Sequence, residues 1–263
     1  MKLHCIPILS ALFTSLVCFS NPATKISDNS PSSGIVIRWN DCEQTIDGFG
    51  IAQAGWAKEL FAFKNRKQVM DKMFGNDGLR LNILRGEIFP HYWENKEDKD
   101  FNLNDDINIE LCDSDFNNKS DDLLRRGQLW LTLEAKNKYH INKLVFSTWS
   151  APAWMKSNGK VSNGKLKPEC YQDFANYLAA FYKAYKSKGI TPYAISPSNE
   201  PGYAAPWNSS LWTADEMGKF ITSNLGPTFQ KENIPAKIIF GENPLWSVVM
   251  PQLKMVSSKD FTD

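Results

Sequence analysis

The sequence has almost no excess of charge of either sign. Thirty basic residues stand against 29 acidic ones, which gives a net charge of +1, and no long block of either sign interrupts the chain. Proteins that bind nucleic acid present a basic patch or stripe to the phosphates. The charge pattern therefore predicts a neutral or weakly charged partner and no nucleic acid.

Cysteine is scarce as well. Of five cysteines, only Cys42, Cys112 and Cys170 lie beyond the N-terminal segment, and the sequence contains no Cys-x-x-Cys and no Cys/His spacing typical of a metal site. This excludes a small disulfide scaffold and predicts no metal. One disulfide plus a free thiol remains open, and the sequence does not decide which of the three cysteines would pair.

Long apolar runs are absent except at the N-terminus. There Lys2 and His4 precede an apolar run of roughly fifteen residues, and small and polar residues follow, which is the layout of a secretory signal peptide. We predict a signal peptide over residues 1–23, cleaved between Ser20 and Ala23, and a secreted or periplasmic protein. A bacterial lipoprotein acylated on Cys18 is the alternative, although Val17 replaces the small residue preferred before such a cysteine. We predict no stable membrane insertion.

The rest of the chain has the composition of a folded protein, with 42% hydrophobic residues. After a flexible leader over 24–34, strand-like and helix-like segments alternate, which predicts a parallel sheet covered by helices. The expected strands are 35–45, 44–50, 78–86, 142–150, 192–196 and 236–243, and the expected helices are 56–74, 121–139, 168–189, 213–232 and 248–258. We interpret the Asp/Asn-rich stretch 94–122 as a long, solvent-exposed insertion.

Polar side chains and one tryptophan follow several of these strands directly. In a parallel α/β barrel, the C-terminal ends of the strands form the functional face. A single charged residue after a strand is ordinarily a turn or cap residue, but four strands share the feature, which indicates a common cleft. The residues are Arg85 and Glu87, Trp149, Asn199 and Glu200, and Glu242 and Asn243.

Five blocks, in order, resemble glycoside hydrolase family 30, which holds glucosylceramidases, endo-β-1,4-glucuronoxylanases and endo-β-1,6-glycanases. The blocks are "IDGFG", "GLRLNILRG", "FSTWSAPAWMKSNGKVSNGKLK", "YAISPSNEP" and "TADEMGKFITSNLGPTF". The resemblance runs from about Ile46 to the C-terminus. It implies an α/β fold, a (β/α)₈ TIM barrel, with a β-sandwich side domain to which residues 35–45 would contribute the first strand and 46–263 forming the barrel part.

The resemblance also implies roles for individual residues. Glu200 matches the acid/base of a retaining glycosidase, Asn199 a partner of the sugar 2-hydroxyl, and Arg85 an arginine that orients the nucleophile. Trp149 matches a tryptophan of the sugar subsite. Trp56, Trp154 and Trp207 are further candidates for substrate contacts, and for Trp56 a place in the core is an equally good expectation.

One part of the family pattern has no match. The family nucleophile is a glutamate at the end of the seventh barrel strand, whereas Glu242 follows the fifth, so no residue of this chain is assigned that role. We therefore expect a barrel truncated after about five strands.

Two functional classes follow from this. The first is a secreted retaining β-glycoside hydrolase that acts on polysaccharide such as xylan or β-1,6-glucan or galactan, with a glucosyl lipid as the alternative substrate. The second is a carbohydrate-binding protein without catalysis, in which Trp149, Trp154, Trp207 and Trp212 stack on sugar. Neither requires a cofactor.

Overall fold

The computed structural model describes residues 38, 40–53, 56–93, 95–97 and 127–243. The predicted signal peptide, the leader, most of 94–122 and the helix at 248–258 lie outside these residues. Of the described residues, Arg38 and 40–47 belong to a unit distinct from the main body. Within it, Arg38 and residues 40–45 include no strand and form a turn closed by the Asp41 N–H, which donates to the Arg38 carbonyl at 3.2 Å. The β-sandwich side domain stays a prediction.

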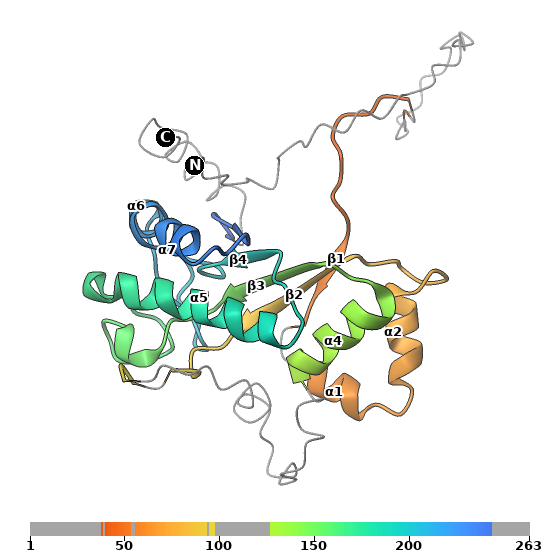
Figure 1. Cartoon of the computed structure of the whole chain (residues 1–263), viewed down its shortest axis with the longest axis horizontal. Helices are drawn as coiled ribbons and strands as arrows, with labels where there is room; N and C mark the ends of the chain where they lie inside the picture. The colour runs from red at the N-terminus through yellow and green to blue at the C-terminus, as the bar shows by residue number, and fades with distance from the viewer. Residues whose placement is uncertain (1–37, 39, 54–55, 94, 98–126, 244–263) are drawn as a thin grey trace. The chain divides into compact units, whose positions relative to one another are not determined.

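The main body is built on one parallel sheet of five described strands in sequential order (Figure 1). The strands are β1 (Gly50–Ala52), β2 (Ile83–Ile88), β3 (Lys143–Thr148), β4 (Ala194–Ser196) and β5 (Lys237–Ile238). Each strand pairs with the next in parallel. The described residues therefore contain the five parallel strands that the sequence predicts for them, in the order of an α/β fold. This regular βα order brings the C-terminal ends of all five strands to one edge.

Helices join successive strands and supply the outer layer (Figure 1). Their bounds are α1 (Ala57–Ala62), α2 (Arg66–Phe74), α4 (Gly127–Tyr139), α5 (Tyr171–Ser187), α6 (Ala214–Phe220) and α7 (Gly226–Lys231). Helix α5 buries a large aromatic face, which includes Phe174, Tyr177, Phe181 and Tyr185. Each such side chain contributes on the order of 2 kcal/mol when removed from water, so this face holds α5 against the sheet.

Two predicted helices are divided in the structure. The run 56–74 breaks at Phe63, whose backbone is extended, into α1 and α2. The break allows Leu60 of α1 and Met70 and Met73 of α2 to enter the same core, which one straight helix could not do. The run 213–232 contains a π-helical turn, Ile221–Leu225, between α6 and α7.

Strand boundaries also differ from the predictions. The strand expected at 44–50 begins only at Gly50, and the one expected at 78–86 begins at Ile83. Helix α6 begins where its sequence indicates, because Thr213 and Glu216 form a reciprocal capping box. The start of this helix, which depends on local contacts, was therefore predicted correctly. The first residues of the strands, which depend on where neighbouring strands begin to pair, were not.

Candidate functional site

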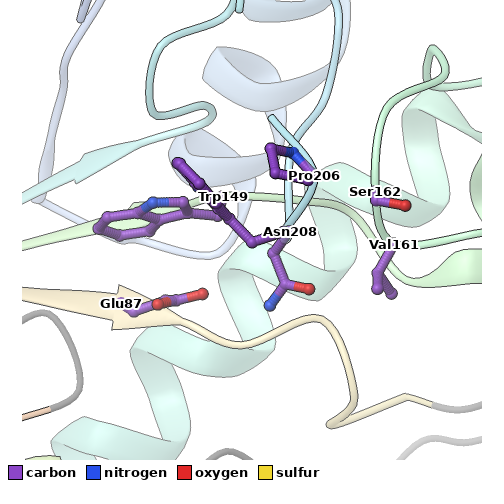
Figure 2. A pocket seen from close by; sticks show the side chains of 7 residues that line it. Glu87, Trp149, Val161, Ser162, Pro206 and Asn208 are labelled. Carbon is purple, nitrogen blue, oxygen red and sulfur yellow. The ribbon is translucent and has the colours of Figure 1, made fainter. Parts of the chain in front are cut away.

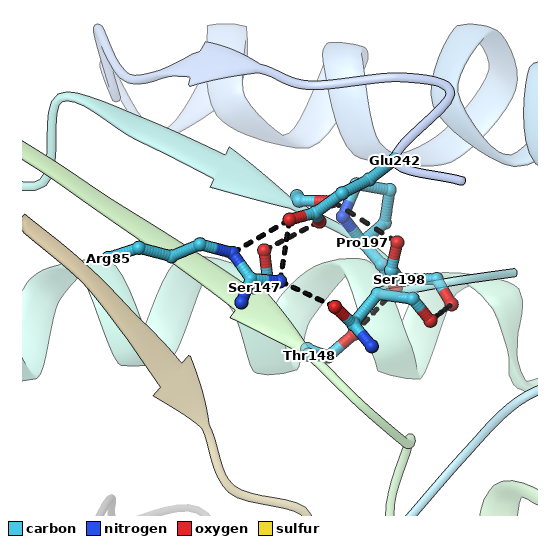
Figure 3. A network of polar contacts seen from close by, with 8 residues as sticks. Arg85, Ser147, Thr148, Pro197, Ser198 and Glu242 are labelled. Atoms are coloured by element: carbon cyan, nitrogen blue, oxygen red, sulfur yellow. Dashed lines mark hydrogen bonds and ion pairs between the residues drawn. The ribbon is translucent and has the colours of Figure 1, made fainter. Parts of the chain in front are cut away.

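Arg85 lies within β2, and not after the strand as predicted, and it connects the segments that follow β4 and β5 (Figure 3). Its Nε donates to Oε1 of Glu242 at 2.7 Å, and its Nη2 donates to Oδ1 of Asn199 at 2.6 Å. The second oxygen of Glu242, Oε2, accepts a hydrogen bond from Oγ of Ser147 on β3 at 2.7 Å. Strands β2 and β3 are thus linked to the segments that follow β4 and β5 through one arginine–carboxylate pair.

The Arg85–Glu242 pair is largely shielded from water. About a fifth of each side chain is exposed, 22% and 23% respectively. In such surroundings charge-assisted hydrogen bonds are stronger and more directional than at an open surface. The network therefore presents the Asn199 side chain in one orientation.

Glu200 stands in a turn whose backbone is fixed on both sides. Its φ of 45° lies in the left-handed region, which costs a residue with a side chain of the order of 1 kcal/mol and is found most often at functional sites. The Glu200 N–H donates to the Glu242 carbonyl at 2.8 Å, and the preceding N–H, of Asn199, donates to the Thr148 carbonyl at 2.6 Å.

Trp149, directly after β3, packs on the other side of this network. The Arg85 guanidinium carbon lies 4.5 Å from the centre of the Trp149 ring, which is a cation–π contact. The contact fixes the indole and leaves the rest of its surface for other groups. Trp149 thereby joins the polar network to the hollow beside it.

A pocket of about 440 Å³ opens next to Trp149 (Figure 2). Glu87 and Trp149 line it from the ends of β2 and β3, and two loops supply the other walls. Residues Val161 and Ser162 come from the β3–α5 loop; Pro206, Trp207 and Asn208 come from the β4–α6 loop. Aromatic faces combined with amide, hydroxyl and carboxylate groups suit a neutral polar ligand that has apolar faces, such as a sugar ring.

Gln128 fixes the position of Glu87, and no sequence signal indicated this glutamine. Its Oε1 accepts from the Glu87 N–H at 2.6 Å, and its Nε2 donates to the Glu87 carbonyl at 2.7 Å and to the Tyr185 hydroxyl at 2.9 Å. Gly86 permits this approach, since a Cβ there would lie 2.6 Å from the Gln128 Oε1. The backbone of β2 is therefore anchored to α4 directly below the pocket.

The predicted site residues separate into two groups. Arg85, Trp149, Asn199 and Glu200 gather at the C-terminal edge of the sheet, and Trp207 lines the pocket. Trp56 and Trp154 are half-buried and packed against the core; their Nε1 groups donate to the carbonyls of Ala52 at 2.7 Å and Trp93 at 3.2 Å. Their role as substrate contacts stays a prediction. Trp212 is buried among aromatic side chains.

Sequence reasoning gave Glu242 no role, yet its carboxylate is the partner of Arg85 among the residues described. Only its position after β5 pointed to this edge of the sheet. In the same described ranges, no group of three His, Cys, Asp or Glu side chains is arranged to hold a metal ion. No helix there has both the length and the apolar character needed to cross a membrane.

Comparison with known proteins places this geometry in context. A family model described as "Glycosyl hydrolase family 30 TIM-barrel domain" matches residues 46–241. The chain is 30% identical over 200 residues to "Putative glucosylceramidase 3" of Caenorhabditis elegans, covering 72% of this chain and 37% of that protein. It is 28% identical over 237 residues to the endo-1,6-β-D-glucanase of Neurospora crassa, covering 83% and 45%.

Among solved structures, an endo-β1,6-glucanase has a similar fold. It superposes with a TM-score of 0.64 at 22% identity, over 83% of this chain and 50% of the other. At that identity the likeness concerns the fold alone. The chain thus spans less than half the length of the two curated relatives and half of this structure.

Proposed function

Since the chain belongs to glycosyl hydrolase family 30, whose TIM-barrel model matches residues 46–241, we propose that the whole protein carrying it is a secreted retaining β-glycosidase. The observation that carries the proposal is the Arg85 network, which fixes Asn199 beside Glu200 at the C-terminal edge of the sheet. That edge is where barrel enzymes carry their catalytic groups.

Glu200 is the proposed acid/base. In the first step its carboxylic acid gives a proton to the glycosidic oxygen as the bond to the anomeric carbon breaks. In the second step its carboxylate takes a proton from the water that attacks the glycosyl-enzyme. Asn199, held by the Arg85 Nη2, is positioned to hydrogen-bond the sugar 2-hydroxyl. Double displacement also needs a nucleophilic carboxylate, and we propose that a strand outside the five described here supplies it.

The proposed substrate is a β-linked polysaccharide such as xylan or β-1,6-glucan or galactan. Trp207 and Tyr203 support this, since their side chains are 56% and 47% exposed on the loop that follows Glu200. Their ring centres lie 6.4 Å apart and the ring planes are inclined by 57°, so each ring offers a face of its own on which a sugar unit can stack. The loop that follows the acid/base adjoins the leaving group, so these rings would contact the sugar that departs.

A glucosyl lipid is the alternative substrate, and the identity to the Caenorhabditis elegans protein is the observation that favours it. The two substrates predict different behaviour of the aromatic pair. Removing the Trp207 side chain should weaken the binding of a substrate whose leaving group is a sugar more than the binding of one whose leaving group is a lipid. The reason is that stacking of a flat sugar ring on the indole is lost in the first case only.

A non-catalytic carbohydrate-binding protein is the candidate from a different class. It is favoured by the engagement of the Glu242 carboxylate with both Arg85 and Ser147, which commits this carboxylate to a structural contact. Binding of oligosaccharide without release of reducing sugar by the whole protein would support it.

The deciding experiment is Glu200→Gln in the whole protein, with Glu232→Gln on the exposed end of α7 as the matched control. The amide keeps its size but neither gives nor takes the proton, so hydrolysis of polysaccharide should fall by roughly 10²–10⁴-fold. With an activated aryl β-glycoside, bond cleavage is spared and the glycosyl-enzyme accumulates. Azide should then restore turnover and yield a β-glycosyl azide. Near-normal hydrolysis, or an α-configured azide, would overturn the assignment.

A further inference from the structure

Lys156 is a fully buried lysine that the proposed chemistry does not use. Its side chain has 0% exposure, and it sits in the β3–α5 loop, seven positions after Trp149. Burying an ammonium group is costly unless each of its three N–H bonds finds an acceptor. The contacts of the Lys156 ammonium group must therefore compensate for its removal from water.

The three hydrogen bonds of Lys156 go to two separate segments. Nζ donates to Ser150 Oγ at 3.1 Å, directly after Trp149, and to the Ser209 carbonyl at 2.7 Å and Ser210 Oγ at 2.9 Å in the β4–α6 loop. All three acceptor residues are themselves buried. Because the acceptors are neutral, burial lowers the pKa of Lys156 to about 8, and at neutral pH the ammonium form predominates.

The segments joined by Lys156 are the two loops that wall the pocket. The Ser209 N–H donates to the Val161 carbonyl at 3.0 Å, and the Asn163 N–H donates to Ser209 Oγ at 2.9 Å. Ser162 and Asn208, which both line the pocket, form an antiparallel bridge between the two loops. Lys156 does not line the pocket itself.

We propose that Lys156 is a positioning residue, which holds the β3–α5 and β4–α6 loops together and so sets the shape and glycan affinity of the pocket between them. An ammonium suits this task because its three donors reach two chain segments at once, and charge-assisted hydrogen bonds resist local opening. The inference about glycan rests on the proposed function. The inference about loop positioning does not.

The test compares Lys156→Met with the chain that has the natural sequence, by residue-resolved hydrogen exchange. Methionine keeps most of the apolar stem and removes the charge and all three donors. The amides of Asn163 and Ser209 should exchange at least about tenfold faster, since each charge-assisted bond contributes at least that factor. Amides of α5 and β3 should keep their protection. Unchanged protection of Asn163 and Ser209 in a folded variant would overturn the proposal.

Lys165→Met is the matched control. Lys165 belongs to the same loop, but its Nζ donates at 2.8 Å to Glu216 of α6 on the solvent side, where an ion pair contributes little. Exchange at Asn163 and Ser209 should not change in this variant. If Lys156→Met fails to fold, Ser210→Ala removes one acceptor only. The same two amides then decide the proposal, with faster exchange supporting it and unchanged exchange overturning it.

Affinity for glycan separates positioning from a merely structural role. Titration of the folded proteins with xylotetraose and gentiotetraose should give dissociation constants at least about tenfold weaker for Lys156→Met, whereas Lys165→Met binds as the natural sequence does. If Lys156→Met binds the two tetrasaccharides as tightly as the natural sequence does, although its loop amides exchange faster, the proposed effect of Lys156 on glycan affinity is overturned. If the natural sequence binds neither probe while exchange responds as expected, the positioning role stands and the proposed function fails.

Discussion

Arg85 and Glu242 lie 157 positions apart in the chain, yet the Arg85 Nε donates to the Glu242 Oε1 at 2.7 Å. The Glu242 carbonyl also accepts the N–H of Glu200. Glu242, in the segment after β5, therefore fixes both the direction of the Arg85 guanidinium and the backbone of Glu200, the proposed acid/base. The positioning of Glu200 therefore depends on a residue for which no role was predicted.

Breaking this pair should destabilise the chain measurably. In Arg85→Met, the Glu242 carboxylate keeps only its Ser147 partner in partly buried surroundings. We expect the free energy of unfolding to fall by about 2 kcal/mol or more, as measured by urea denaturation. Lys183→Met, which removes an exposed pair with Glu232, is the control and should leave the transition unchanged. Equal effects of the two substitutions would contradict the role given to the network.

The contact between β2 and α4 should not tolerate a methyl group at Gly86. A Cβ at this position would lie 2.6 Å from Gln128 Oε1 and 2.7 Å from the Phe146 ring. Gly86→Ala should therefore lower the free energy of unfolding by about 1–3 kcal/mol. Gly202→Ala is the control, because its nearest recorded neighbour is 3.8 Å away. A neutral Gly86→Ala would show that the strand and helix can move apart freely.

Trp207 should matter for binding and not for folding. Its side chain is 56% exposed and lines the pocket, so Trp207→Ala should keep the thermal midpoint and weaken oligosaccharide binding by about tenfold. Calorimetric titration measures the effect. Leu79→Ala removes another exposed apolar side chain, 72% exposed, that does not line the pocket. This control should bind normally, and a similar loss in both variants would argue against stacking on Trp207.

Stability should respond to pH through Lys156 in a defined direction. Its pKa is lowered to about 8 in the folded chain from 10.5, so between these values the unfolded state binds more protons. By linkage, this lysine makes the free energy of unfolding rise with pH in that window, with a slope of at most about 1.4 kcal/mol per pH unit. Below pH 8 its contribution is a constant penalty.

The difference between the natural sequence and Lys156→Met isolates this contribution. Urea titrations between pH 8 and 10 should show the stability gap moving in favour of the natural sequence as pH rises. The upper limit avoids Tyr139, whose pKa is raised to about 12 mainly by burial and which acts in the opposite direction above pH 10. A gap that is constant over this window would mean that the pKa of Lys156 is not lowered by burial.

Much of the architecture could be predicted from local sequence pattern. Alternating strand-like and helix-like runs indicated the parallel βα order, the helix expected from residue 213 begins at the Thr213 cap, and the helix expected over 168–189 contains α5. These features depend on residues a few positions apart, whose physics is contained in the local chain. The positions of Trp149 and Glu200 after strands likewise predicted a shared edge, whereas Arg85 lies within β2.

Tertiary contacts decided the rest. Phe63 breaks a helical run so that α1 and α2 can share one core, Gln128 anchors the backbone of Glu87, and Lys156 finds its acceptors more than fifty positions away in Ser209 and Ser210. A local window contains no information on such partners, because the energy of a buried polar group depends on which distant oxygen or nitrogen the fold brings to it. The sequence therefore determined which residues reach the site, and only the folded structure determined what holds them there.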